Sequence, residues 1–332
     1  MKIGKVTGNV LKRSVLRPIT YRREEILKGA GLGEDCALFA VPEGFMLTSC
    51  VQEAAVAGKA DMEVLVGRCA NSLAAAGSRP IAAMLGVLLP KEAEEPMLKQ
   101  LMTTAHEACQ KFKMQIAGGH TMVSSAVTCP FVTATAYGLL PRECTEILTG
   151  PKAGQDIVLS KWIGLEGTAL LVQKYKDRLL DRYPVRMITE AACFDTSVSV
   201  IPEAEVAVRS GAAYMHDVSE GGILAALWEM AEGAAVGLDI DLRRLPIRQE
   251  TVEVCEYLGA NPYELSSGGC LIMTTDDGES LVQALSLAGI PARIIGKVTA
   301  GKERLIRNEE EIRYMDRPAV DEIYKFIWRK EQ

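Results

Sequence analysis

The chain has few aromatic residues and few histidines, and it has no long apolar run. Phe, Trp and Tyr make up 5% of its 332 residues, and His occurs three times. So few rings argue against a stacking platform for nucleic-acid bases. The longest apolar run, IAAMLGVLL at residues 81–89, is too short to span a bilayer. The opening residues, MKIGKVTGNVLKRS, lack the apolar segment of a signal peptide, so we expect a cytoplasmic protein without a membrane partner.

Cysteine follows no recognisable pattern, and basic residues are not in excess. No C-x-x-C pair occurs among the nine cysteines, so we expect reduced, mostly buried thiols rather than a zinc site or a disulfide framework. The formal net charge of −6 argues against a nucleic-acid partner. Only the N-terminus is locally basic, which fits a solvated surface or, as a sharper alternative, a site for a small anionic partner.

Strand-like and helix-like runs alternate along the chain, which predicts an α/β protein with mixed sheets. The clearest runs are an expected strand at 45–51, a helix at 62–77, a strand at 81–90 and a helix at 92–114. Gly150, Pro151 and Gly154 then separate two apolar systems. We therefore divide the chain into an N-terminal domain, residues 1–150, and a C-terminal domain, residues 151–332.

The segment GLGEDCA, residues 31–37, combines a flexible backbone with acidic side chains. Gly31 and Gly33 permit a tight turn, and Glu34 and Asp35 place two carboxylates side by side. Carboxylate oxygens are ligands that Mg²⁺ prefers. A metal site is therefore one interpretation, and a solvated acidic turn is the other.

The segment AGGHTMV, residues 117–123, has the composition of a phosphate-binding turn. Gly118 and Gly119 would free two backbone N–H groups after a strand, with His120 and Thr121 as side-chain donors. An ordinary Gly-Gly turn has the same composition. The pattern alone leaves both interpretations open.

Two further segments in the C-terminal half stand at expected helix starts. In IGLEGTALL (163–171), Gly167 and Thr168 would lie where a helix opens and could receive an anion. In MHDVSEGG (215–222), we expect Asp217, Ser219 and Glu220 at the start of the next helix, with Ser219 as its N-cap and Glu220 in its first turn. Each segment permits either an ordinary capped helix or a phosphate site.

These segments, in this order, resemble the AIR synthase (PurM-like) superfamily, which includes thiamine-monophosphate kinase, selenophosphate synthetase and the hydrogenase maturation factor HypE. The resemblance is strongest to the HypE-like, AIR synthase-related branch. It rests on GLGEDCA, NSLAAAGSRP, GGHT, KAGQDIVLSKWIGLEGTALL, MHDVSEGGILAALWEMAE and LSSGGCLIM.

The resemblance implies a two-domain PurM-like fold whose N-terminal domains form a homodimer across a β-barrel-like interface. It also implies bound ATP and Mg²⁺, and the activation of an amide, carboxyl or similar oxygen on an unidentified small-molecule or protein-borne acceptor. By position, the implied metal ligands are Glu34, Asp35 and Asp217, and the implied catalytic residues are Asp217 and His120. The implied nucleotide or phosphate contacts are Gly31, Gly33, Gly118, Gly119, Thr121, Gly167, Thr168, Ser219 and Gly221.

Several positions depart from the family pattern. Gln52, Ser72 and Met122 stand where acids are usual, so ATP turnover could be weak, altered or absent and the Mg²⁺ site is incomplete. The last cysteine is Cys270, whereas HypE carries its dehydrated group on a C-terminal cysteine. We favour an ATP-dependent phosphoryl-transfer enzyme, and a catalytically degenerate nucleotide or metabolite sensor, or a scaffold, is the alternative. A purely structural dimer without a ligand is the third interpretation. We also hypothesise that His120 substitutes for a missing acid as a metal or phosphate ligand.

Overall fold

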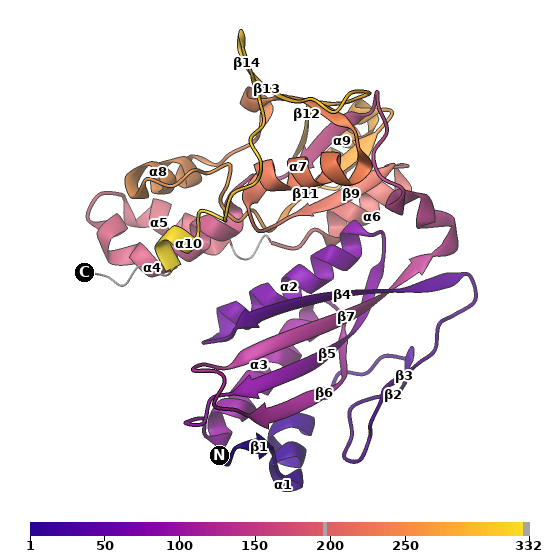
Figure 1. Cartoon of the computed structure of the whole chain (residues 1–332), viewed down its shortest axis with the longest axis vertical. Helices are drawn as coiled ribbons and strands as arrows, with labels where there is room; N and C mark the ends of the chain where they lie inside the picture. Colours follow the sequence, from indigo (N-terminus) through magenta and orange to yellow (C-terminus); the bar gives the residue numbers. More distant parts are fainter. Residues whose placement is uncertain (195–197, 328–332) are drawn as a thin grey trace. The chain divides into compact units, whose positions relative to one another are not determined.

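The computed structural model describes residues 1–194 and 198–327. Backbone packing divides the chain into two compact units (Figure 1). Unit 1 comprises residues 1–74 and 78–143, and unit 2 comprises residues 75–77 and the chain from Cys144 onward. Each unit has its own sheet, and each is described separately below.

Unit 1 is built on a five-stranded sheet of order β1-β6-β5-β7-β4. The pair β5/β6 is parallel, whereas β1/β6, β5/β7 and β4/β7 are antiparallel. Its elements are β1 (Gly4–Lys5), α1 (Gly8–Val10), a π-helical turn η1 (Leu11–Leu16), β2 (Ile26–Lys28), β3 (Leu38–Phe39), β4 (Phe45–Ala55), α2 (Lys59–Ala75), β5 (Arg79–Leu89), α3 (Glu95–Lys111), β6 (Gln115–Val123), β7 (Phe131–Pro141) and the 3₁₀ turn η2 (Arg142–Leu148).

Helices cover one face of this sheet. In α3 the residues Leu98, Leu101, Met102, Ala105 and Ala108 recur at helical spacing and are all buried. From α2, the Cys69 carbonyl accepts a hydrogen bond from the thiol of Cys50 in β4 at 3.4 Å. Strands β5 and β7 alternate buried and half-buried positions, which is the pattern of a sheet with one covered face.

Unit 2 contains a seven-stranded mixed sheet of order β14-β13-β10-β12-β8-β11-β9. Only β10 and β13 pair in parallel among these strands as described. Its elements are β8 (Asp156–Ser160), α4 (Leu165–Leu180), α5 (Val185–Ala192), α6 (Ile201–Arg209), β9 (Tyr214–Val218), α7 (Gly222–Ala234), β10 (Gly237–Asp241), η4 (Leu242–Arg244), α8 (Gln249–Leu258), β11 (Cys270–Thr275), α9 (Gly278–Leu287), β12 (Ala292–Thr299), β13 (Arg304–Asn308), β14 (Glu311–Tyr314) and α10 (Tyr324–Ile327).

Unit 2 has two apolar clusters. In the first, α7 packs on the sheet through Ile223, Leu227 and Met230. In the second, α4, α5 and α8 pack on one another and also bury Ile323 and Phe326 from the end of the described chain. The predicted α/β class with mixed sheets is confirmed by the two sheets and their helices.

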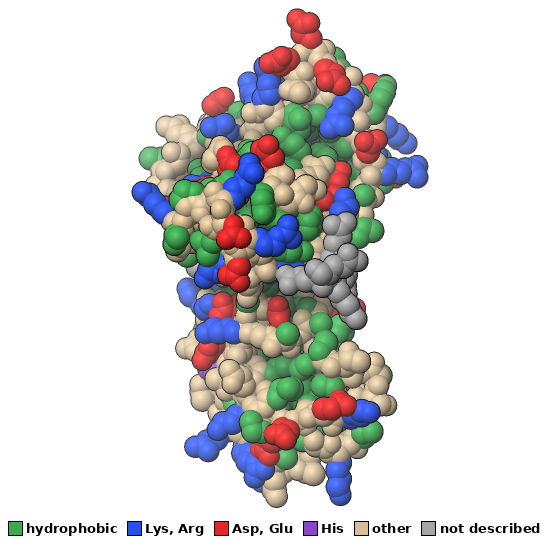
Figure 2. Space-filling view, turned by 90° about the vertical axis from the view of Figure 1, so that its left-hand side faces the viewer, with side chains coloured by type: hydrophobic (Ala, Val, Ile, Leu, Met, Phe, Trp, Pro, Cys, Tyr) green, Lys and Arg blue, Asp and Glu red, His purple; other side chains and the backbone are tan. Residues whose placement is uncertain are grey.

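The expectation that the cysteines are mostly buried is wrong, because only Cys69, Cys109, Cys255 and Cys270 of the nine are buried. On the face drawn in Figure 2, basic and acidic side chains are interspersed. All nine cysteines lie within the described residues and are free thiols. Burial raises the pKa of Cys109 to about 12, so this thiol is an inert packing group. Within the described residues, no helix has both the length and the apolar character needed to cross a membrane.

A buried carboxylate fixes the start of β2 in unit 1. Both carboxylate oxygens of Glu25 accept hydrogen bonds from Arg23, at 2.7 and 2.9 Å, and Arg79 of β5 adds a third at 3.0 Å. The Glu25 side chain is 4% exposed. The hydrogen bonds from Arg23 lower the pKa of Glu25 from 4.5 to about 2.

We predict that this carboxylate makes folding sensitive to acid. Its pKa is lower in the folded chain, so its contribution is complete above pH 4.5 and is lost as the pH falls toward 2. Urea denaturation at pH 7 should show Glu25→Gln to be about 2 kcal/mol less stable than wild type. The difference should shrink steadily toward pH 2. The same change at the exposed residue Glu43 should have no such effect, and a difference that is constant with pH would contradict the assignment.

Candidate functional site

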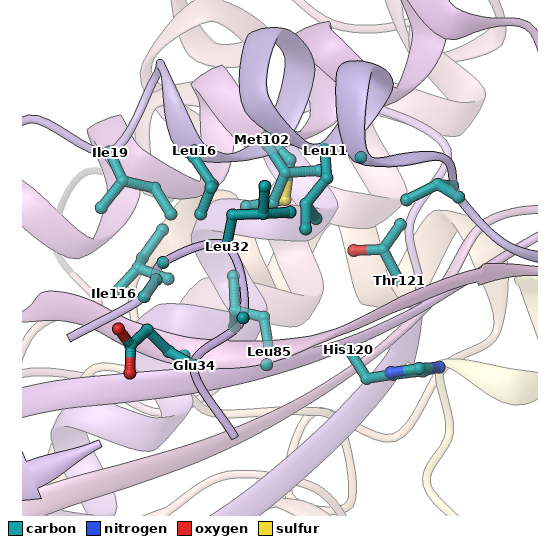
Figure 3. Close-up of a pocket in the computed structure, with 18 of the residues that line it drawn as sticks. Leu11, Leu16, Ile19, Leu32, Glu34, Leu85, Met102, Ile116, His120 and Thr121 are labelled. Atoms are coloured by element: carbon teal, nitrogen blue, oxygen red, sulfur yellow. The ribbon is translucent and has the colours of Figure 1, made fainter. Parts of the chain in front are cut away.

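Unit 1 contains a cavity of about 420 Å³ between its N-terminal segment, the loop after β2, and strands β5 and β6 (Figure 3). Residues chosen from two separate sequence motifs line it together. They are Gly31, Gly33, Glu34, Asp35, Gly118, Gly119, His120 and Thr121. The fold therefore brings together two glycine-rich segments, residues 31–37 and 117–123, that are far apart in the sequence.

The loop at residues 29–37 forms one wall of the cavity. Gly33 has a φ of +80°, a conformation that other residues rarely adopt. Glu34 forms an ion pair with Lys28, and this hydrogen bond raises the pKa of Lys28. Between the two glycines, Leu32 reaches toward Leu11 of the N-terminal segment (Figure 3). Glu34 thus anchors the loop, and Asp35 lines the cavity beside it.

The expected phosphate-binding turn at Gly118–Gly119 is wrong, because both glycines lie inside strand β6. The register between β5 and β6 shifts here, which leaves Ala117 as an extra residue in β6. At Gly119, with φ of +147°, a Cβ atom would lie 2.0 Å from the carbonyl oxygen of Leu85. This glycine is therefore required by the close approach of two strands.

The extra residue in β6 decides which side chains face the cavity. Side chains of a strand normally alternate between its two faces, so an even-numbered and an odd-numbered residue point to opposite faces. Ile116, before the extra residue, and Thr121, after it, are nevertheless both buried on the helix-covered face. Both residues line the cavity. In Figure 3, Thr121 lies near Leu11 and His120 lies farther from the apolar side chains. His120 is exposed, and because it neighbours Thr121 in the strand its side chain points to the opposite, uncovered face of the sheet, at the edge of the cavity.

Sequence reasoning missed several contributors to this cavity, including Lys5 and Met102. Lys5 of β1 supplies a basic side chain, and Met102 of α3 supplies part of the apolar wall. Lys5 belongs to the locally basic N-terminus, but composition could not show that β1 pairs with β6 and places it beside Met122. The basic N-terminus therefore contributes to a site as well as to the surface.

In unit 2, the start of α4 does not offer an open anion site. Thr168 is fully buried and hydrogen-bonds to Thr251 at 3.0 Å, so the expected role as an anion donor is wrong. The N–H of Gly167 already donates to the carbonyl of Ser266 at 2.9 Å. A Cβ atom at Gly167 would lie 2.4 Å from Leu265, so this glycine is needed for packing.

The motif MHDVSEGG is also arranged differently from the prediction. Asp217 lies within strand β9, where it pairs with Leu271 of β11, and is not at the start of a helix. The N-cap of α7 is Gly221, with φ of +81° and no side-chain cap, so the expected Ser219 cap is wrong. The carbonyl of Ser219 instead accepts the N–H of Ser267 at 3.1 Å.

These segments of unit 2 nevertheless converge on Ser266 and Ser267. Gly164 donates its N–H to the hydroxyl of Ser267 at 2.8 Å. The N–H of Gly221 donates to a carboxylate oxygen of Asp321 at 2.6 Å, and so does the Ser266 hydroxyl at 2.7 Å. The sequence motif LSSGG pointed to the serines without assigning them a role, whereas nothing in the sequence pointed to Asp321.

Among the residues that the structure describes, the acids form no ready-made magnesium site. Nowhere in the described residues do three His, Cys, Asp or Glu side chains come together to hold a metal ion. Glu34 forms an ion pair with Lys28. Glu34 and Asp35 are the two acids among the residues lining the cavity, so Asp35 has no further carboxylate beside it there. Gln52, Ser72 and Met122 supply no carboxylate where the family pattern has acids.

The two-unit architecture, with a mixed sheet and covering helices in each unit, defines an α/β class of protein, and comparison with known proteins identifies the family. Residues 33–140 match the family described as AIR synthase related protein, N-terminal domain, and residues 152–307 match its C-terminal domain. The chain therefore belongs to the AIR synthase related family, which confirms the resemblance predicted from the motifs.

Individual relatives agree with this assignment. Carbamoyl dehydratase HypE of Rhodobacter capsulatus is 25% identical over 283 residues, covering 84% of this chain and 79% of that protein. The solved structure of hydrogenase maturation protein HypE in complex with ATP matches with a TM-score of 0.76 at 18% identity, covering 96% and 97% of the two chains. Thiamine-monophosphate kinase from Stenotrophomonas maltophilia matches with a TM-score of 0.73 at 19% identity, covering 93% and 99%. The structural matches confirm the two-domain PurM-like fold.

We predict that Gly119 cannot be replaced without displacing β6. A methyl group there would overlap the backbone of Leu85, so Gly119→Ala should lower the free energy of unfolding by about 3 kcal/mol or more. Gly86 is the matched control, because a Cβ there would meet Thr133 at an ordinary 3.7 Å. Thermal denaturation of the two variants checks this, and equal stability would contradict the close approach.

Proposed function

We propose that this chain binds ATP and uses it to activate an amide, carboxyl or similar oxygen by phosphoryl transfer, in the maturation of a metal cofactor of the hydrogenase type. The observation that carries the proposal is the cavity of unit 1, which gathers both glycine-rich motifs of that unit around one space. Its volume of about 420 Å³ lies within the range of small-molecule sites.

The cavity combines the groups that a nucleotide needs. Apolar side chains such as Leu16 and Ile116 offer a surface to an uncharged ring, and His120 and Lys5 offer donors to phosphate oxygens. Membership of the AIR synthase related family supports this use, as does the relative whose solved structure holds ATP. In this proposal His120 takes the position of an acid and contacts phosphate directly.

In this proposal Cys270 is not the acceptor. The last cysteine, Cys270, is fully buried in β11, and burial raises its pKa. It is therefore neither on a tail nor nucleophilic. We infer that the acceptor is a separate small molecule or a partner protein. We place Asp217 and Ser219 on the acceptor side of the reaction, in the C-terminal domain at residues 151–332.

A sensor or scaffold that binds nucleotide without turning it over is the second candidate. The specific observation in its favour is that, among the residues that the structure describes, the acids form no metal-binding group. Transferring a phosphoryl group without such charge neutralisation is difficult. Binding without phosphate release would favour this candidate, whereas measurable release would favour the enzyme.

We also propose that the protein is a homodimer formed through the uncovered face of the unit 1 sheet. On β4, Leu47 and Val51 are 42% and 58% exposed. Val51 pairs with Thr135 of β7, which pairs with Met84 of β5, so the exposed Val51 and the half-buried Thr135 and Met84 form one continuous row. An apolar sheet face of this kind is stabilised by a second copy that covers it.

For nucleotide binding, we predict that titration calorimetry with a non-hydrolysable ATP analogue will detect binding, and that His120→Ala will weaken it about tenfold. Loss of one charge-assisted hydrogen bond to phosphate accounts for this factor. His106→Ala is the matched control, since His106 lies on α3, hydrogen-bonds to Thr20 at 3.0 Å and does not line the cavity.

The same titration tests the role of the Lys5 side chain and the need for Mg²⁺. Lys5→Gln should weaken the triphosphate but not adenosine, and Lys2→Gln, an exposed lysine outside the cavity, should change neither. Unchanged affinity in both His120→Ala and Lys5→Gln would overturn this placement of the nucleotide. Tight binding only with Mg²⁺ would mean that metal ligands are completed by the nucleotide.

For the dimer, we predict that Val51→Glu will convert the protein to a monomer, because the interface would bury a charged carboxylate against apolar side chains. Sedimentation equilibrium should give twice the chain mass of 36.0 kDa for wild type and the chain mass for the variant. Val41→Glu, at an exposed residue outside the sheet, should remain dimeric. A monomeric wild type would refute the proposal.

A further inference from the structure

The cavity of unit 1 has charged groups at its exposed rim and apolar side chains in its buried part. The titratable residues that line it are all exposed, and they are Lys5, Glu34, Asp35 and His120. In the buried part, the side chains of Leu85, Met102 and Ile116 are each 2% exposed. The buried part therefore suits an uncharged group of a ligand, and a charged group has its partners at the rim.

One polar side chain lies in the buried part. Among the residues that line the cavity, Thr121 combines a polar side chain with burial, being 5% exposed. In Figure 3 its hydroxyl oxygen points toward the apolar side chains around Leu11 and Leu32. Its backbone carbonyl accepts the N–H of Val6 at 3.4 Å, whereas its hydroxyl has no hydrogen-bond partner among the described residues. A buried hydroxyl thus faces the cavity with its donor and acceptor capacity unused by the protein.

The sheet holds this hydroxyl in place before any ligand arrives. Thr121 lies inside β6, where it pairs with Val87 of β5 on one side, and its carbonyl bonds to the segment after β1 on the other. The side chain of threonine is branched at Cβ and has few accessible rotamers in a strand. A ligand therefore loses little affinity to the ordering of this group, which is the property of a pre-organised binding site.

An apolar wall with one hydroxyl fits a planar ring that has hydrogen-bonding atoms at its edge. The faces of such a ring contact aliphatic side chains, while a hydroxyl can donate to a ring nitrogen or accept from an amino group. A nucleobase has both features. Phosphate groups find no charged donor in the buried part, whereas Lys5 offers one at the rim. The cavity therefore distinguishes the two ends of a nucleotide.

We propose that Thr121 orients the nucleotide in the cavity of unit 1, with its hydroxyl bonded to the edge of the base. The base lies in the buried part, and the phosphates lie at the rim. This inference rests on the proposed binding of ATP in the same cavity and specifies which end of the nucleotide enters it. The threonine of GGHT then binds the base, which is a different role from the phosphate contact expected from the motif.

Titration calorimetry with adenosine, which has the base but no phosphate, tests this role apart from phosphate binding. Thr121→Val removes the hydroxyl from a side chain of nearly the same shape, so it should weaken adenosine and the non-hydrolysable ATP analogue alike, by about tenfold. Thr121→Ser keeps a hydroxyl and should recover most of the affinity. Lys5→Gln has the opposite signature, because it should weaken the triphosphate and leave adenosine unchanged.

Thermal denaturation of the ligand-free proteins separates binding from packing. Because the Thr121 hydroxyl has no protein partner, Thr121→Val should have a Tm equal to that of wild type or higher by a few degrees. Thr251→Val is the matched control. The Thr251 hydroxyl is fully buried in unit 2 and hydrogen-bonds to Thr168 at 3.0 Å, so this variant should have a lower Tm and unchanged affinity for adenosine.

The outcomes for Thr121 and for the proposed function can be told apart. Adenosine that fails to bind wild type while the ATP analogue binds, or that binds wild type and Thr121→Val equally, would overturn the role of Thr121 and leave the proposed function standing. A lower Tm for Thr121→Val with unchanged affinity would mean a packing role and would also overturn it. Adenosine binding without binding of the ATP analogue would support Thr121 and contradict the proposed function. If neither ligand binds wild type, both proposals fail.

Discussion

The candidate site of unit 1 depends on one close contact between two strands. At Gly119 the β6 backbone lies so near Leu85 of β5 that no side chain fits between them. This contact follows the extra residue Ala117, which exchanges the two faces of the strand. Without the exchange, Thr121 would leave the cavity. The glycines of GGHT therefore serve the ligand indirectly, through strand geometry, rather than by wrapping around a phosphate.

The two glycine pairs of the chain solve different physical problems. In β6, glycine permits two parallel strands to approach, while Gly221 and Gly222 adopt a left-handed backbone in which the N–H of Gly221 donates to the Asp321 carboxylate and that of Gly222 to the Ser219 carbonyl. A composition-based argument treats both pairs alike. Only their partners, the Leu85 carbonyl in one case and the Asp321 carboxylate in the other, distinguish a glycine that lets two strands approach from one whose N–H donates to a carboxylate.

Much of the fold could be predicted from the sequence, because apolar periodicity reports burial directly. The helix expected at 62–77 is α2 (Lys59–Ala75), and the strand expected at 81–90 is β5 (Arg79–Leu89). The site was less predictable. A local pattern indicated glycines and acids, but a bulge in β6, the burial of Thr168 and the distant Asp321 depend on tertiary contacts that no short motif encodes. Family resemblance supplied the order of the motifs and not their conformations.

Three of the departures from the expected family pattern replace an acidic side chain by an uncharged one. A chain with Gln52, Ser72 and Met122 at usually acidic positions has fewer carboxylates to hold a metal, so any phosphate it binds must be neutralised by groups of its own. The structure offers such groups in unit 1, where Lys5 and His120 line the cavity. In unit 2, the carboxylate of Asp321 accepts hydrogen bonds from the Gly221 N–H and the Ser266 hydroxyl, so it is paired with donors and not with other acids. With no metal-binding group among the described residues, the proposed function depends on direct contact between protein donors and phosphate.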